Sequence, residues 1–267
     1  MIFYENNGVE SMNVNYLKKK LETAQALGTW CVIDSPMVVD VMATTGLDFI
    51  IIDAEHGPIS YETAQQMVMA CESHNISPIM RVGKLDEVSV LRALDIGIHG
   101  LQLPNISTVE DANNLVKFAK YPPIGVRGFS PYTKAGLYDV TKGKTLPKHA
   151  NDNTLLIANV EGVEGIKNID AISNVEHIDI IFIGLFDLSK SLGIPGDVEN
   201  PKVIEALKNA IKTVKNNGKK IGSIAANKNM LEQFVELGVD YITYSVDAGV
   251  IKEAYAGIVK SFDKKRG

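Results

Sequence analysis

The chain has 267 residues, of which 45% are hydrophobic and 22% are charged, and its formal net charge is −5. This composition excludes a disordered chain, a collagen and a simple coiled coil, and the length allows one large domain or two small ones. No basic run is dense enough to bind a phosphate backbone, and no apolar run reaches the ~18 residues of a membrane span, so neither nucleic acid nor a membrane is an expected partner.

The amino-terminal segment and the cysteines bear on the compartment. Residues 1–11 are polar and lack a basic start followed by an apolar core, so no signal peptide is expected. Cys31 and Cys71 have no CxxC spacing and lie in apolar segments, which favours buried free thiols over a disulfide or a zinc site. We therefore expect a cytoplasmic protein.

Short apolar runs rich in β-branched residues alternate along the chain with amphipathic helical patterns. Such continuous apolar runs are typical of parallel strands that are covered on both faces. The expected strands are 30–33, 48–53, 77–82, 99–104, 154–161, 178–184, 220–225 and 240–245. The expected helices are 35–46, 60–74, 85–97, 107–120, 163–175, 200–218, 227–238 and 246–262.

Capping residues support these helix boundaries. Three polar residues stand at expected N-cap positions, and Glu110 completes a capping box with one of them. Glycines stand where helices are expected to end. The N-caps are Ser60, Ser107 and Asn200, and the glycines are Gly46, Gly97, Gly218 and Gly238.

Strands that are each followed by a helix, eight times over, predict a (β/α)8 TIM barrel, whose usual length is ~250 residues. Residues 1–267 then form a single domain, with an extra amino-terminal helix from Val14 to Leu27. A doubly wound open sheet is the alternative, but no GxGxxG follows the first strand. Residues 121–153 are the longest interruption, and loops of this length are usually functional or disordered.

The active site of such a barrel forms at the carboxyl ends of its strands, where this chain carries several ionisable residues. Glu161 and Asp187 follow adjacent expected strands. Two facing carboxylates repel each other unless a cation such as Mg²⁺ or Mn²⁺ lies between them or one is protonated. A purely structural interpretation is also open, in which each carboxylate caps the helix that follows it.

Three further residues have both a structural and a catalytic interpretation. His56 ends the polar tetrad Asp53-Ala54-Glu55-His56. Arg81 emerges from a buried strand and must be paired, either with Asp53 or with a substrate carboxylate, which its planar fork suits. Asp95 lies in the last turn of its helix, where it opposes the helix dipole, so it is expected to have a specific partner. A hydrogen bond from His56 to Asp95 would fix the tautomer of the imidazole.

Several motifs occur in order between Leu27 and Ser245, with barrel spacing between them. They are DFIIIDAEHGP, MRV, LDIGIHGLQLP, YPPIGVRG, VEGVEGIKNID, FIGLFDLSKSLG and YSVD. On these motifs the chain resembles the HpcH/HpaI aldolase family. The resemblance implies a metal-dependent pyruvate aldolase, which reversibly cleaves a 4-hydroxy-2-oxo acid to pyruvate and an aldehyde.

The resemblance also implies a role for each site residue. Glu161 and Asp187 match the ligands of a divalent metal (Mg, Mn or Co), and Arg81 matches the residue that binds pyruvate and stabilises its enolate. His56 with Asp95 matches a proton-transfer dyad. Backbone amides near Phe186 and Asp187 would bind the pyruvate carboxylate, and Trp30 would line the pocket. The family further implies a homohexamer in which the carboxy-terminal helix packs against a neighbouring subunit.

Two motifs depart from the family pattern. Asn159 stands where the family usually has a glutamine, which shortens the amide expected to contact pyruvate. Leu185 replaces a proline, and Phe186 fills a position that is usually small, so its ring is expected to narrow the site. Three alternatives to the aldolase remain open: a related lyase acting on a CoA thioester and an oxaloacetate decarboxylase, which the family resemblance allows, and a non-catalytic protein on the aldolase scaffold, which these departures allow.

Overall fold

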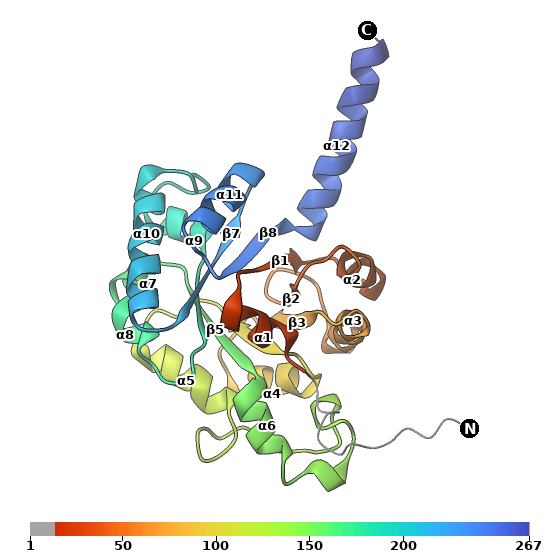
Figure 1. The fold of residues 1–267 in the computed structure, drawn as a ribbon, viewed down its shortest axis with the longest axis vertical. Coiled ribbons are helices and arrows are strands. Elements are labelled where there is room, and N and C mark those ends of the chain that lie inside the picture. The colour runs from red at the N-terminus through yellow and green to blue at the C-terminus, as the bar shows by residue number, and fades with distance from the viewer. Residues whose placement is uncertain (1–13, 267) are drawn as a thin grey trace, which may run out of the picture.

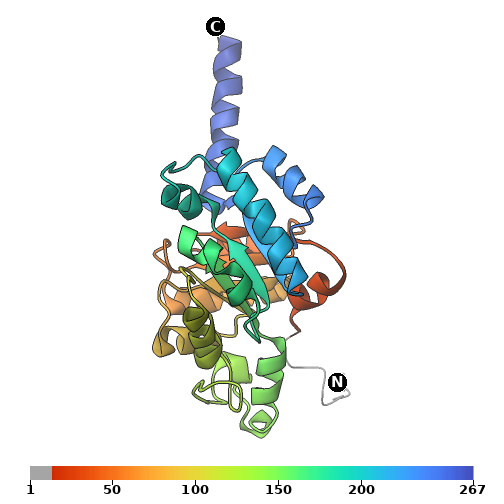
Figure 2. The same cartoon turned by 90° about the vertical axis from the view of Figure 1, so that its left-hand side faces the viewer.

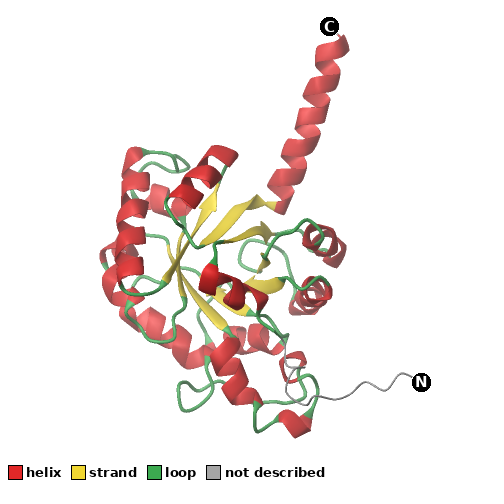
Figure 3. Cartoon of the chain, viewed as in Figure 1, coloured by secondary structure: helices red, strands yellow, loops and turns green. Residues whose placement is uncertain are grey.

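The computed structural model describes residues 14–266, in which eight parallel strands close into a barrel (Figures 1 and 3). Each strand pairs with the next along the chain, and β8 pairs with β1. The strands are β1 Ala26–Cys31, β2 Phe49–Asp53, β3 Ser77–Arg81, β4 Gly100–Leu103, β5 Leu155–Val160, β6 Ile180–Ile183, β7 Lys220–Ala225 and β8 Tyr241–Val246. The predicted (β/α)8 barrel is confirmed, and the open-sheet alternative is wrong because the strand order closes on itself.

Helices surround the barrel as Figure 3 shows, with strands in yellow and helices in red. They are α1 Tyr16–Thr23, α2 Pro36–Ala43, α3 Tyr61–Ser73, α4 Glu87–Asp95, α5 Val109–Ala119, α6 Leu146–Asn153, α7 Val163–Lys167, α8 Ile169–Ser173, α9 Leu185–Ser191, α10 Pro201–Asn216, α11 Lys228–Glu236 and α12 Asp247–Arg266. The N-caps Ser60 and Asn200 are confirmed, and the four predicted glycines all have positive φ.

The boundaries of two predicted helices are wrong. The amino-terminal helix ends at Thr23 and not at Leu27, because the N–H of Ala26 already donates to Asp240 O (2.8 Å) at the start of β1. The helix predicted over 163–175 is divided at Asn168 into α7 and α8.

The predicted capping box and the predicted loop also differ from the structure. Thr108, not Ser107, is the N-cap of α5, and Asp111, not Glu110, completes the capping box. The segment 121–153 holds α6 and two short 3₁₀ turns, Lys134–Gly136 and Val140–Lys142. Residues 1–11, on which the expectation about a signal peptide rests, lie outside the described residues.

Aromatic side chains fill the inside of the barrel below the carboxyl ends of the strands. The rings of Phe49 and Tyr241 stack with centroids 4.1 Å apart, and Phe182 meets Tyr241 edge-on. Glycine makes room for them: a Cβ on Gly28 would lie 2.4 Å from the Phe49 ring, and one on Gly222 would lie 2.7 Å from Tyr241 Cδ1. This packed layer fills the barrel interior. Open space is therefore expected only above it, at the carboxyl ends of the strands.

The last helix, α12, leaves the barrel and extends away from it, as the two views in Figures 1 and 2 show. Its first residue is fixed, since the buried Asp247 carboxylate accepts the N–H groups of Val32 (3.1 Å) and Ile33 (3.0 Å). Among residues 14–266, no helix is both long enough and apolar enough to cross a membrane.

Candidate active site

A cavity of about 290 Å³ opens at the carboxyl ends of the strands. Its lining combines ionisable groups with aromatic and aliphatic walls. Of the residues predicted from the sequence, it includes Trp30, His56, Arg81, Glu161, Phe186 and Asp187. The barrel therefore gathers these residues, which are far apart in the chain, around one space.

Arg81 is the most constrained group at this cavity. Its Nε and Nη2 atoms donate to the two oxygens of Asp53, at 2.8 and 2.6 Å. Nη1 lies 3.0 Å from Glu55 Oε2 in an ion pair, and the guanidinium lies over the Trp30 ring, 4.3 Å from its centroid. The Trp30 indole is held in turn by donating from Nε1 to Thr243 Oγ1 (2.9 Å). The predicted pairing with Asp53 is therefore confirmed, and Arg81 also lines the cavity, where its contact with a substrate carboxylate stays a prediction.

Burial and charge oppose each other at Arg81. Burial alone would lower the pKa of this guanidinium, but the hydrogen bonds and charge of Asp53, with the charges of Glu55 and Glu161, raise the pKa above its usual value. Burial raises the pKa of the neighbouring Glu55 carboxyl, although Arg81 opposes that shift. Arg81 is thus a permanent cation within a ring of carboxylates.

Glu161 follows β5 and is buried beside the cavity. Its Oε2 accepts the N–H of Asn105 (3.0 Å), a residue with a φ of 57° just beyond β4, and its Oε1 accepts from Asn159 Nδ2 (3.0 Å). Burial raises the pKa of Glu161 against the effect of these bonds and of Arg81. Gly184 leaves room for the side chain, since a Cβ there would lie 2.7 Å from Glu161 Cγ.

Asp187 lies in the first turn of α9, is exposed and lines the same cavity. Its side chain forms a long ion pair with Lys190 at 3.9 Å. The structure does not support the capping interpretation, because the N-caps of α7 and α9 are Gly162 and Gly184. The charge of Asp187 contributes to raising the pKa of Glu161, so the two carboxylates act on each other.

These two carboxylates fit a divalent cation. Both line one cavity, both offer hard oxygen donors, and the buried one lacks a cation of its own beyond Arg81. Within residues 14–266, no group of three or more His, Cys, Asp or Glu side chains lies close enough to form a complete metal site. Mg²⁺ and Mn²⁺ suit a site with one or two protein carboxylates, because water and substrate oxygens take the other positions.

Leu185 and Phe186, the departures in the α9 motif, both line the cavity but differ in exposure. Leu185 is fully buried in the core between the barrel and its helices. Phe186 is 48% exposed and lines the cavity.

Within one chain, the two residues of the predicted proton-transfer dyad, His56 and Asp95, are not in contact. His56 is exposed at the cavity after β2, and its ring makes no hydrogen bond to any residue between 14 and 266. Asp95 ends α4 shortly before β4 begins, so it lies at the opposite end of the barrel. Its partner there is Arg127, whose Nη2 donates to Asp95 Oδ1 (2.9 Å). Sequence spacing predicted that Asp95 has a specific partner but not which one.

Asn159 is fully buried and does not line the cavity. Its side chain instead joins Glu161 to Gln102, since Gln102 Nε2 donates to Asn159 Oδ1 (2.8 Å). The sequence analysis missed Gln102. The available signal was a lone amide in the apolar run HGLQLP, because a buried polar side chain requires a partner.

The chain is similar to known proteins over most of its length. Residues 26–254 match the family described as HpcH/HpaI aldolase/citrate lyase. The chain is 30% identical to a pyruvate aldolase of Rhizobium etli, over 93% of this chain and 98% of that protein. It is 28% identical to a 4-hydroxy-2-oxo-heptane-1,7-dioate aldolase of Escherichia coli, over 88% of this chain and 90% of that one. The crystal structure of an HpcH/HpaI aldolase/citrate lyase family protein from Burkholderia cenocepacia J2315 superposes with a TM-score of 0.89 at 27% identity, over 94% of this chain and all of that chain.

The Arg81–Asp53 pair predicts a large effect on stability. Asp53→Ala leaves the buried guanidinium with Glu55 alone, and we expect the free energy of unfolding to fall by about 3–5 kcal/mol in urea titrations. Asp40→Ala is the matched control, because it breaks a pair with His74 (2.8 Å) whose carboxylate is exposed, and it should cost about 0–1 kcal/mol. Equal losses in the two variants would show that Arg81 is not held by Asp53.

Proposed function

This chain belongs to the HpcH/HpaI aldolase/citrate lyase family, and we propose that it is an aldolase that reversibly cleaves a 4-hydroxy-2-oxo acid to pyruvate and an aldehyde. One observation carries the proposal: a fixed, permanently charged guanidinium faces the same cavity as the carboxylates Glu161 and Asp187. A small 2-oxo acid carries negative charge that suits the guanidinium and oxygen atoms that suit a cation between the carboxylates.

Arg81 would stabilise the charge that develops during cleavage. When the C3–C4 bond breaks, its electron pair becomes the double bond of a pyruvate enolate, and the negative charge moves to the oxygen on C2. Arg81 has five N–H donors, of which Asp53 accepts two, so others remain for this oxygen. Because Asp53, Glu55 and Trp30 already fix the guanidinium, little reorganisation is required when the charge appears.

His56 is the candidate base. Cleavage requires removal of the proton on the C4 hydroxyl, and the exposed imidazole at the rim of the cavity is suited to accept it. The aldehyde then leaves, and C3 of the enolate takes up a proton to give pyruvate. Trp30 and Phe186 would cover the substrate with apolar surface on either side.

A divalent cation (Mg, Mn or Co) held by Glu161 and Asp187 would polarise the 2-oxo group as a Lewis acid. The first-turn N–H groups of α9, near Phe186 and Asp187, have no partner within their helix and suit the carboxylate of the substrate. With its two buried free cysteines, the enzyme suits a reducing, cytoplasmic setting.

We further propose that the enzyme is a homo-oligomer, a hexamer on the family pattern, in which α12 packs against a neighbouring subunit. One side of this helix carries an exposed apolar stripe at i, i+4, i+7 and i+11, formed by Ile251, Tyr255, Ile258 and Phe262. Such a stripe is unfavourable in water and is expected to be covered.

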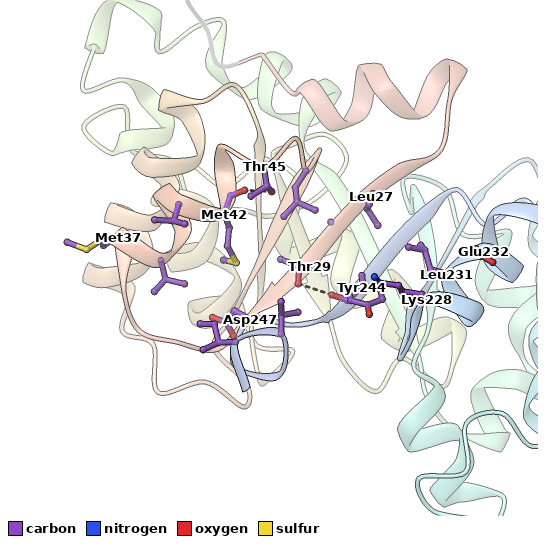
Figure 4. A pocket seen from close by; sticks show the side chains of 16 residues that line it. Leu27, Thr29, Met37, Met42, Thr45, Lys228, Leu231, Glu232, Tyr244 and Asp247 are labelled. Carbon is purple, nitrogen blue, oxygen red and sulfur yellow. Dashed lines mark hydrogen bonds between the residues drawn. The ribbon is translucent and has the colours of Figure 1, made fainter. Parts of the chain in front are cut away.

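The barrel offers a matching groove where its last helix would otherwise lie. An apolar hollow of about 680 Å³ opens between α2, α11 and the start of α12, beside β1 (Figure 4). Its walls include Leu27, Met42, Leu47 and Leu231. The apolar stripe on α12 of a second copy would cover this groove, because α12 of the same chain extends away from the barrel (Figures 1 and 2).

Association between subunits also bears on Asp95. Within one chain it lies at the opposite end of the barrel from His56. A contact between the two side chains would therefore have to form between subunits, and the predicted proton-transfer dyad depends on the assembly.

The metal role predicts the effect of chelation. Thorough chelation should abolish release of pyruvate from 4-hydroxy-2-oxo acids, and added Mg²⁺, Mn²⁺ or Co²⁺ should restore it. Glu161→Gln should remove both the activity and its restoration. Glu164→Gln, an exposed change in α7, is the matched control and should leave activity unchanged. Full turnover after chelation would exclude the cation.

The same substrate panel separates this function from its alternatives. Assays with a CoA thioester and with oxaloacetate should give lower rates than assays with 4-hydroxy-2-oxo acids. A faster reaction with either compound would replace the aldolase assignment with that lyase or decarboxylase activity.

The oligomer proposal predicts the effect of charge on α12. In light scattering coupled to size exclusion, the wild type should have several times the 29.1 kDa mass of one chain. Ile258→Glu combined with Phe262→Glu should give monomers, because two charges would enter the apolar groove. Lys264→Glu, on the same helix, should keep the wild-type mass. A monomeric wild type would contradict the proposal.

A further inference from the structure

Three polar side chains cross the packed inside of the barrel and end at Glu161. The hydroxyl of Tyr241 on β8 donates to Gln102 Oε1 on β4 (3.1 Å). Gln102 Nε2 donates to Asn159 Oδ1 on β5 (2.8 Å), and Asn159 Nδ2 donates to Glu161 Oε1 (3.0 Å). Tyr241, Gln102 and Asn159 all have no exposed surface. We call these three residues the donor chain.

The direction of the donor chain follows from its ends. An ionised carboxylate only accepts hydrogen bonds, so Asn159 must present its Nδ2 to Glu161. Its Oδ1 then faces Gln102 and requires a donor, which only the Nε2 of that amide supplies. Gln102 Oε1 is left to accept from the Tyr241 hydroxyl. Reversing any one amide would place two donors or two acceptors against each other.

The surroundings keep the Tyr241 hydroxyl in place as a donor. Its ring is stacked on Phe49 and is met edge-on by Phe182, so the hydroxyl has little freedom to move. Burial raises the pKa of Tyr241 well above its usual value, so the group stays protonated. Apolar side chains would fill this space without the free-energy cost of burying polar groups. Buried polar side chains are therefore expected here only if each of them is hydrogen-bonded.

We propose that Gln102 and Tyr241 are positioning residues for the divalent cation: through Asn159 they hold the Glu161 carboxylate in its binding orientation. The inference rests on the proposed role of Glu161 as a metal ligand. The Asn105 N–H holds Oε2 from one side and the donor chain holds Oε1 from the other, so the carboxylate is clamped at both oxygens. Outer partners of this type commonly set metal affinity because they orient the ligand.

The test is Mn²⁺ binding to the metal-free, full-length protein, with free Mn²⁺ measured by electron paramagnetic resonance. Asn159→Leu should weaken binding by about 10–100-fold, and Gln102→Met by about 10-fold. Tyr241→Phe keeps the ring stack and removes only the hydroxyl, and it should weaken binding by roughly 3–10-fold. Near-UV circular dichroism of each metal-free variant checks that the aromatic core is retained.

A double-mutant cycle separates the donor chain from general loosening of the core. In the Gln102→Met background, adding Tyr241→Phe should have no further effect, because the connection is already broken. Ser223→Ala removes another fully buried hydroxyl, which bonds to Ile183 O (2.9 Å) on the neighbouring strand, and should bind Mn²⁺ within about 2-fold of wild type.

Several results would overturn the inference. They are wild-type affinity in Tyr241→Phe and Gln102→Met, additive losses in the double variant, or an equal loss in Ser223→Ala. Glu161→Gln distinguishes failure of the proposed function. If Glu161→Gln binds Mn²⁺ like the wild type, Glu161 is not a metal ligand and the proposed metal site fails. If Glu161→Gln loses binding while the Gln102 and Tyr241 variants keep it, only the positioning role of the donor chain fails.

Discussion

Arg81 ends the buried strand β3, and its guanidinium stays protonated. The arrangement of the candidate site follows from how neighbouring groups balance this positive charge. Asp53 takes two of its donors, Glu55 supplies a second negative charge, and Trp30 covers its face. Removing a guanidinium from water costs free energy that only such close pairing offsets. The Arg81 guanidinium also acts on Glu161. Without it, the buried Glu161 carboxylate would have no positive charge near it. Positive and negative groups at the cavity therefore depend on one another, and a negatively charged substrate with a divalent cation would fit between them.

The packed barrel makes this arrangement rigid. Stacked aromatic rings close the space below the cavity, and glycines on neighbouring strands give them room. The donor chain of Tyr241, Gln102 and Asn159 crosses this layer and ends on Glu161. Core and site are thus connected by hydrogen bonds as well as by the backbone. The last helix, α12, differs from this paired core. Its apolar stripe and the groove beside α2 and α11 have no partners within the described chain.

The sequence predicts the fold well because strand and helix periodicity are local properties. Seven of the eight strands lie within two residues of their predicted bounds, whereas β1 runs over Ala26–Cys31 and not over 30–33. Glu161, Asp187, Arg81 and His56 lie at one cavity because parallel strands end together. Side-chain partners are not local, and there prediction was weaker. Asp95 pairs with Arg127 at the other end of the barrel, a contact between α4 and a segment 32 residues later that periodicity does not encode. The donor chain requires three strands in register, so Gln102 alone gave only the signal of an unpaired buried amide. The choice between Ser107 and Thr108 as N-cap depends on backbone geometry at a single residue.

Formation of the pyruvate enolate is the step on which the proposed chemistry depends, and it is measured without knowledge of the aldehyde. Pyruvate is incubated with the enzyme in D₂O, and loss of the methyl proton signal is followed by nuclear magnetic resonance. We expect exchange that requires a divalent cation and falls by at least about 100-fold in Arg81→Lys, because lysine lacks the planar fork that Asp53 holds in place. Exchange no faster than in buffer, with Mg²⁺, Mn²⁺ and Co²⁺ each supplied, would contradict the assignment of this cavity as a pyruvate aldolase site.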